Sequence, residues 1–120
     1  MRTRALVAVV VAALLLATTT VAAASPISRA QAVRKAKEYL QFTAFSLQGL
    51  VEQLKFEGFS TSDATYGASH AGADWNREAA AKAKEYLKME AFSHSGLVQQ
   101  LEFEGFTPAQ AEFGVRAAGL

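Results

Sequence analysis

The amino-acid sequence predicts an all-α fold, in which two tandem three-helix repeats of the helix-turn-helix kind pack together after an N-terminal signal peptide. The first observation is internal repetition: residues 32–72 align without a gap on residues 79–119, with 23 identities in 41 positions. The second is the repeat period of 47 residues, which is typical of helical units, together with apolar residues at helical spacing. The third is an apolar segment at the start of the chain.

That first segment, residues 1–24, has the composition of a secretory signal peptide. Arg2 and Arg4 precede an apolar run over residues 5–17, and small residues lead up to Ala24. The strongly apolar run is about 13 residues long, whereas a helix needs roughly 20 residues to span a bilayer. We therefore expect cleavage after Ala24 and export of the chain, with an uncleaved membrane anchor as the alternative.

The first repeat is assigned to residues 25–72 and predicted to form three helices. Ser28 and Gln31 make a capping box ahead of a first helix that runs to about residue 44. One face of this helix is apolar at i, i+3, i+4 and i+8, through Ala36, Tyr39, Leu40 and Ala44.

The second and third helices of this repeat have local start and stop signals. Ser46 is expected to cap the second helix, and Gly58 to end it in the left-handed conformation, with Phe59 folding back onto the helix. Ser60, followed by Asp63, then caps the third helix. The second helix should turn Leu50, Val51 and Leu54 inward.

The second repeat, residues 73–120, carries the same signals. Its third helix has the stronger start, because Thr107 is a cap, Pro108 suits the first helical position, and Gln110 completes a capping box. The connection over residues 72–76 is too short for a flexible linker, so the two units should touch, with Trp75 at the joint between them.

Composition and motif content argue against nucleic-acid binding and against catalysis. The chain has 12 Lys+Arg and 11 Asp+Glu, and loss of Arg2 and Arg4 would leave 10 against 11, a net charge near −1. The third helix of the first repeat contains no Lys or Arg that could read bases. With no cysteine, the chain has no disulfide, thiolate metal site or cysteine nucleophile. We expect no nucleic-acid partner.

No residue type recurs in a pattern that suggests catalysis. His70 and His94 occupy non-corresponding positions in the two repeats, which favours ordinary surface residues. Glu57 and Glu104 do correspond, but each lies in a last helical turn, where a nearby lysine or backbone group is the expected partner. The repeated aromatic residues Tyr39, Phe45, Phe56 and Phe59 are interpreted as core. The sequence predicts no enzyme, no cofactor and no metal site.

A longer motif, "KAKEYLxxxAFSxxGLVxQLxFEGF" followed by "ATYGASHAGADWN" or "AEFGV", resembles the repeat of the Ltp family of host cell-surface-exposed lipoproteins. This resemblance covers residues 29–116. It implies a secreted or surface-exposed binding protein of phage superinfection exclusion, which contacts a phage component and stops incoming DNA from crossing the membrane. One departure is clear: Ala24-Ser25 stands where a lipid-anchored member would have its lipobox cysteine.

Positions that differ between the repeats are the candidates for partner contact. The second repeat gains carboxylates at Glu90, Glu102 and Glu112, and these predict a basic segment of a phage or surface protein as the partner. We expect a monomer that touches a membrane only if the leader is retained. The alternative function is a structural or adhesive cell-surface module with no role in phage exclusion.

Overall fold

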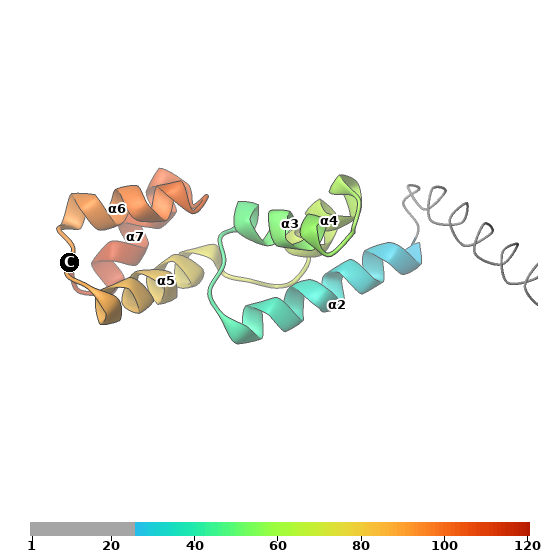
Figure 1. Cartoon of the computed structure of the whole chain (residues 1–120), viewed down its shortest axis with the longest axis horizontal. Coiled ribbons are helices and arrows are strands. Elements are labelled where there is room, and N and C mark those ends of the chain that lie inside the picture. The colour runs from blue at the N-terminus through green and yellow to red at the C-terminus, as the bar shows by residue number, and fades with distance from the viewer. Residues whose placement is uncertain (1–25) are drawn as a thin grey trace, which may run out of the picture.

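The computed structural model describes residues 26–120 and folds them into two units of three helices each (Figure 1). The first unit consists of α2 (Pro26–Phe42), α3 (Leu47–Phe56) and α4 (Thr61–Ser69); the second consists of α5 (Trp75–Met89), α6 (His94–Phe103) and α7 (Pro108–Ala117). The predicted all-α class and the tandem three-helix architecture are confirmed. The leader, residues 1–24, lies outside the described residues, and the limits of the repeats at residues 25–72 and 73–120 stay a prediction.

Each unit has its own core, built from leucine and alanine at corresponding positions. Leu50 and Leu54 of α3 are fully buried, as are Leu97 and Leu101 of α6. Val51 is only partly buried against the first core. Small residues complete the cores, with Ala36, Ala64, Ala68 and Ala71 in the first and Ala79, Ala83, Ala111 and Val115 in the second, where Phe106 is also buried. Because these side chains are short, the helices can approach closely.

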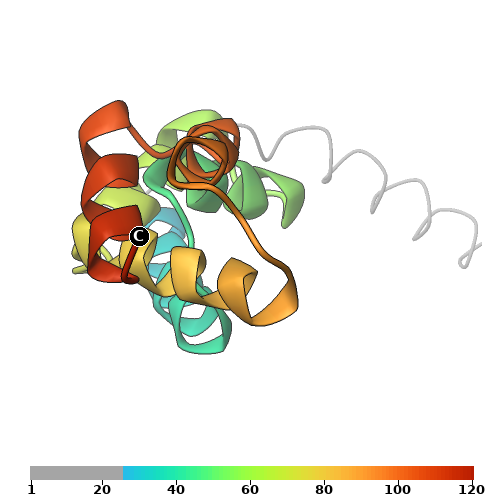
Figure 2. The same ribbon diagram turned by 90° about the vertical axis from the view of Figure 1, so that its left-hand side faces the viewer.

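The closest approach within each unit is between its first and third helices. A Cβ atom on Gly67 of α4 would lie 2.7 Å from the Cβ of Ala32 on α2. The same contact recurs in the second unit, where a Cβ on Gly114 of α7 would lie 2.8 Å from the Cβ of Ala79 on α5. Figure 2, which turns the second unit toward the viewer, shows its three helices in front of the first unit. Glycine is therefore required at both positions by contact with a neighbouring backbone.

The predicted caps of α3, α4 and α7 are present. The Ser46 hydroxyl accepts a hydrogen bond from the Gly49 N–H, and the Ser60 hydroxyl accepts one from the Asp63 N–H. Thr107 and Gln110 form the predicted capping box of α7, with proline in its first turn. Gly58 ends α3 with φ of 108°, as predicted, and the Phe59 N–H folds back to the Leu54 carbonyl at 3.2 Å.

The bounds of the first helix were predicted less well. Helix α2 begins at Pro26, so Ser28 lies in its first turn and does not cap it. Proline fits this position because its missing N–H would have no partner in the first turn of a helix. The helix also ends at Phe42, two residues earlier than predicted, because residues 43–46 turn away to contact the second unit.

Candidate partner-binding surface

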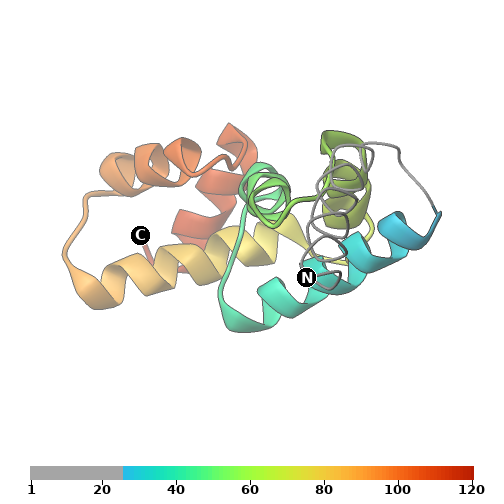
Figure 3. The ribbon, with the colours of Figure 1, turned by 45° about the vertical axis from the view of Figure 1, so that its right-hand side comes forward.

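The joint between the units is asymmetric: a loop of the first unit lies on a helix face of the second. The joint loop, residues 43–48, comprises the connection from α2 to α3 and the first two residues of α3, and it lies beside the start of α5 (Figure 3). The joint face consists of Glu78, Lys82 and Glu85 on α5 with the turn at Glu104-Gly105.

The shortest hydrogen bonds between the joint loop and the joint face are made by Phe45, Thr43 and Ser46, and Lys82 Nζ also donates to the Thr43 hydroxyl at 3.5 Å. The Phe45 N–H donates to Glu78 Oε1 at 3.0 Å, and the Thr43 hydroxyl donates to Glu85 Oε1 at 2.8 Å. The Ser46 hydroxyl, besides capping α3, donates to the Glu104 carbonyl at 2.6 Å. Two of these contacts use main-chain groups, so the loop's backbone path and its side chains both determine the fit.

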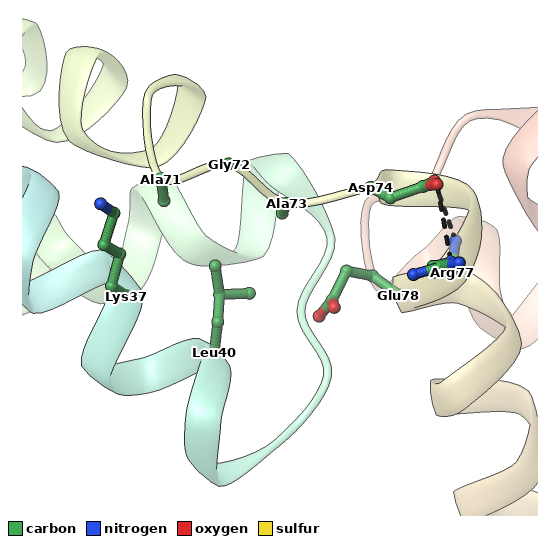
Figure 4. Close-up of a pocket in the computed structure, with 8 residues that line it drawn as sticks. All are labelled: Lys37, Leu40, Ala71, Gly72, Ala73, Asp74, Arg77 and Glu78. Atoms are coloured by element: carbon green, nitrogen blue, oxygen red, sulfur yellow. Dashed lines mark hydrogen bonds and ion pairs between the residues drawn. The ribbon is translucent and has the colours of Figure 1, made fainter.

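Glu78 lies beside an open hollow of about 320 Å³ at this joint (Figure 4). Leu40 of α2 and Glu78 of α5 point into the same space, and Asp74 is bonded to Arg77 at one side. Partial burial raises the pKa of the Glu78 carboxyl, against the opposing effect of the Phe45 N–H. Because Glu78 and Asp74 are already bonded within the chain, the hollow is part of the joint and offers no ligand-binding cluster.

Trp75 lies at the joint, as the sequence predicted. It is the first residue of α5, in the second unit, and it packs against the core of the first unit. The backbone of Trp75 therefore belongs to the second unit, and its indole ring contacts the first.

The three glutamates predicted for partner contact have different surroundings. Glu90 follows α5, Glu102 lies in the last turn of α6, and both are exposed with no partner for their carboxylates among the described residues. Glu112 of α7 accepts from His94 Nε2 at 3.0 Å and from Arg116 Nε at 3.3 Å. No hydrogen bond or ion pair within residues 26–120 joins the three glutamates to one another.

His94 has a larger role than an ordinary surface histidine. Its Nδ1 bonds the Leu120 backbone oxygen at 3.0 Å, and this bond together with Glu112 raises the pKa of His94. The bond from His94 in turn lowers the pKa of the Glu112 carboxyl. The signal for this pair lies in the repeat alignment, because Leu47 and Thr65 of the first unit are replaced together by His94 and Glu112 in the second.

Glu57 and Glu104 accept hydrogen bonds from tyrosines. Tyr39 donates to Glu57, and Tyr86 donates to Glu104 in the same way. The expected lysine partner is also present in the first unit, where Lys35 lies 3.9 Å from Glu57. Both glutamates therefore tie the end of the second helix to the first helix of the same unit, with no geometry that suggests catalysis.

Phe56 was expected in the core, and this prediction is wrong. Phe56 and its counterpart Phe103 are each 86% exposed, because each lies two residues beyond a buried leucine and so about 200° around the helix from it. The corresponding pair Phe42 and Met89 is also exposed. Each unit thus presents two large apolar side chains at the same two positions, which is a feature of protein-binding surfaces when the residues lie near charged groups.

Other kinds of site find little support in this part of the chain. Within residues 26–120, no group of three or more potential ligands could hold a metal ion. No helix among the same residues has the length and apolar character needed to cross a membrane. Helix α4 carries neither Lys nor Arg, so it lacks the groups of a DNA-recognition helix.

Comparison with known proteins gives two matches. A family model for host cell surface-exposed lipoproteins of the Ltp type matches residues 28–70 and again residues 74–117. Among solved structures, the chain is similar to Ltp, a superinfection exclusion protein from the Streptococcus thermophilus temperate phage TP-J34, with 32% identity and a TM-score of 0.72. That match covers 81% of this chain and 99% of the other. No curated protein matches the chain.

Proposed function

Since the chain belongs to the family of host cell surface-exposed lipoproteins, we propose that it is a surface-exposed binding protein of phage superinfection exclusion. The single observation that carries this proposal is the match to Ltp over 99% of that chain, because a likeness of both units and of their order extends beyond one shared motif. In the proposed mechanism the protein contacts a component of an incoming phage outside the host membrane, and the phage DNA then fails to cross.

The end of α6 is the surface that we assign to this contact. Phe103 offers an exposed aromatic ring, and Glu102 beside it offers a carboxylate with no partner among the described residues. Exposed aromatic residues are frequent binding anchors, and unpaired carboxylates attract basic segments. In the first unit the aromatic ring of Phe56 is retained, but Lys55 takes the place of Glu102 and bonds Glu52 at 3.5 Å. The second unit is therefore the one that suits a basic phage segment.

Plating efficiency tests this assignment. Cells that express the parent chain should resist a phage that plates normally on cells without it. Glu102→Lys and Phe103→Ala should each weaken protection by about tenfold or more, since charge complementarity and a buried aromatic anchor each contribute on this scale. Phe56→Ala is the matched control, because it removes the same ring from the first unit. Adsorption of the phage should remain unchanged in all strains, since the block acts after attachment.

The alternative function, a structural or adhesive surface module, predicts a different result. Cells expressing the parent chain would then plate phage normally and differ in wall integrity or adhesion. Full protection by both Glu102→Lys and Phe103→Ala chains, with export equal to that of the parent, would contradict the assignment of the contact to α6. A chain lacking residues 1–24 should not protect, because it would stay inside the cell.

A further inference from the structure

Because the chain is an internal repeat, the loop that forms the joint and the helix face that receives it each occur twice. Only one copy of the loop and one copy of the face take part in the joint. The free loop, residues 90–95 of the second unit, corresponds to the joint loop. The free face, formed by Gln31, Arg34, Lys35 and Glu38 of α2 with the turn at residues 57–58, corresponds to the joint face. Within the described chain, neither is covered by another unit.

Burial at identical residues shows what docking does to these surfaces. Ser46 of the joint loop is 3% exposed, whereas its counterpart Ser93 in the free loop is exposed. Ala44 is buried in the same way, and its counterpart Ala91 is exposed. Since each pair has the same residue type, the difference arises from the contact alone.

The joint face is likewise less exposed to solvent than the free face. The Lys82 side chain on the joint face is 17% exposed, and its counterpart Lys35 on the free face is 38% exposed. A Cβ on Gly105 would lie 2.8 Å from the Ser46 hydroxyl, whereas a Cβ on Gly58 would meet nothing within 4 Å. The residues of the free face, with Glu57 and Phe59, line an open hollow of about 260 Å³. This hollow corresponds to the surface on which the joint loop lies in the second unit.

The hydrogen-bonding groups of the joint are also present in the free loop and face. The Phe92 N–H, counterpart of the Phe45 donor, has no acceptor among the described residues. The Ser93 hydroxyl accepts from the Gly96 N–H at 3.0 Å but, unlike Ser46, donates to no carbonyl. Gln31 replaces Glu78 and still offers a side-chain oxygen as acceptor.

Where the two pairs of surfaces differ, their charges change in opposite directions. On the loop, neutral Thr43 is replaced by Glu90, and Leu47 is replaced by His94, whose ring is paired with Glu112; the free loop therefore gains one unpaired carboxylate. On the face, Glu78 is replaced by Gln31, and Ala81, one helical turn along, is replaced by Arg34. With the glutamates of the two turns included, the net charge rises from −2 on the joint face to zero on the free face. The added positive charge on the free face therefore offsets the carboxylate that the free loop gains.

We propose that the free loop of one copy of this chain docks on the free face of a second copy, repeating the joint between molecules. The Phe92 N–H then donates to Gln31 Oε1, and Ser93 donates to the Glu57 carbonyl. Glu90, in the position of Thr43, then faces Lys35 and Glu38, the counterparts of Lys82 and Glu85, with the Arg34 cation one helical turn away. Because loop and face are different surfaces at different ends, the contact is head-to-tail and leaves one free loop and one free face on every dimer. Copies can add further at both ends, in place of the monomer expected from the sequence.

The test uses two variants, each blocked on one surface. Ala91→Arg fills the free loop with a bulky side chain, and Arg34→Glu leaves the free face with an excess of carboxylates where Glu90 docks. In sedimentation velocity of the full chain, in a detergent that keeps residues 1–24 dispersed, the parent should associate as its concentration rises and dissociate as salt rises. Each variant alone should lose association by about tenfold or more. An equimolar mixture should form a one-to-one dimer, because each variant retains the surface that the other lacks.

Matched controls make the result specific. Ala117→Arg adds the same bulk at the exposed end of α7, and Lys84→Glu makes the same charge reversal at an exposed site on α5; both should associate like the parent. A parent chain that stays monomeric to about 1 mM, a range in which even weak specific contacts are populated, would overturn the proposal. So would a mixture that does not dimerise, or association that survives in both blocked variants or disappears when residues 1–24 are removed. The assay contains no phage, so its outcome is independent of the proposed function.

Discussion

At the scale of single residues, the two units repeat the same buried side chains and differ in their exposed charges. Leu54 and Leu101 are fully buried at corresponding positions, and each lies in the centre of its own core. The position of the unpaired carboxylates, by contrast, changes from one unit to the other. The cores that stabilise the units are therefore built from residues that the repeats share, and the differences between the repeats lie in exposed charges.

Leu54→Ala and Leu101→Ala should each lower the free energy of unfolding by about 2 to 5 kcal/mol, because each leaves a cavity in a small core. Urea denaturation followed by circular dichroism measures the loss. Leu47→Ala is the control, since Leu47 lies 36% exposed at the start of α3 and should cost much less. Equal losses for Leu47 and Leu54 variants would show that the helix faces are assigned wrongly.

The His94–Glu112 pair should make stability depend on pH. The pKa of His94 is raised above its ordinary 6.5, so its contribution is complete below 6.5 and is lost as pH rises through the raised value. The pKa of Glu112 is lowered below its ordinary 4.5, so its contribution is lost as pH falls through the lowered value. Between these limits the parent should be more stable than the His94→Gln variant.

Thermal denaturation of the two chains across the pH range measures this difference. The gap between the parent and His94→Gln should shrink as pH rises above the ordinary pKa of a histidine. His70→Gln, in the first unit and away from Glu112, should leave the dependence as it is in the parent. A gap that is constant with pH would rule out the ion pair as its cause.

At the scale of helices, the starts of α3, α4, α6 and α7 are capped by hydroxyls, and the caps of α3 and α6 differ in whether they make a second hydrogen bond. Ser46 and Ser93 both accept the N–H of a glycine three residues later, with the same backbone conformation. Only Ser46 also donates across the joint, to the Glu104 carbonyl. Comparison of Ser46 with Ser93 therefore distinguishes the contribution of the helix cap from that of the hydrogen bond across the joint.

Ser93→Ala should cost about 1 kcal/mol of stability, the usual value for losing a helix cap. Ser46→Ala should cost about 1 kcal/mol more than that, because it also removes the donor from the partly buried Glu104 carbonyl. Urea denaturation of the two single variants measures the difference. If both losses were equal, the Ser46–Glu104 bond would contribute nothing to the joint.

Signals that act within a few residues were predictable from the sequence. The caps at Ser46, Ser60 and Thr107 and the stop at Gly58 all follow from side chains near the helix ends, so they could be assigned without tertiary information. Phe56 could not, because its exposure depends on which face of α3 the other helices cover. The early end of α2 and the partnership of His94 with Glu112 likewise depend on contacts between segments far apart in the sequence.

At the scale of the whole molecule, the joint decides how the two units present their surfaces. It depends on Glu78, whose side chain accepts the Phe45 N–H at 3.0 Å while burial raises its pKa. A carboxyl with a raised pKa holds its proton more strongly in the folded chain, so stability falls as pH rises from 4.5 through the raised value. At neutral pH the ionised Glu78 carboxylate therefore lowers the stability of the folded chain, and the hydrogen bond from the Phe45 N–H offsets this loss.

Glu78→Gln should keep the acceptor oxygen, remove this pH dependence, and leave the chain as stable as the parent or more so at neutral pH. Glu78→Ala should weaken the joint, because the Phe45 N–H loses its acceptor. The lone tryptophan, Trp75, reports the joint by its fluorescence: its emission should shift to longer wavelength with Ala and not with Gln. Equal shifts for the two variants would show that the hydrogen bond does not hold the joint.

The contacts of Gly67 with Ala32 and of Gly114 with Ala79 also have a mechanical consequence. With backbone against backbone, α4 cannot roll or slide over α2, nor α7 over α5, without collision, so each unit behaves as a stiff body. A force that pulls the two units apart then acts on the covalent connection, residues 70–74. It also acts on the hydrogen bonds that Thr43, Phe45 and Ser46 make across the joint. Under tension we therefore expect these hydrogen bonds to break before either unit changes shape.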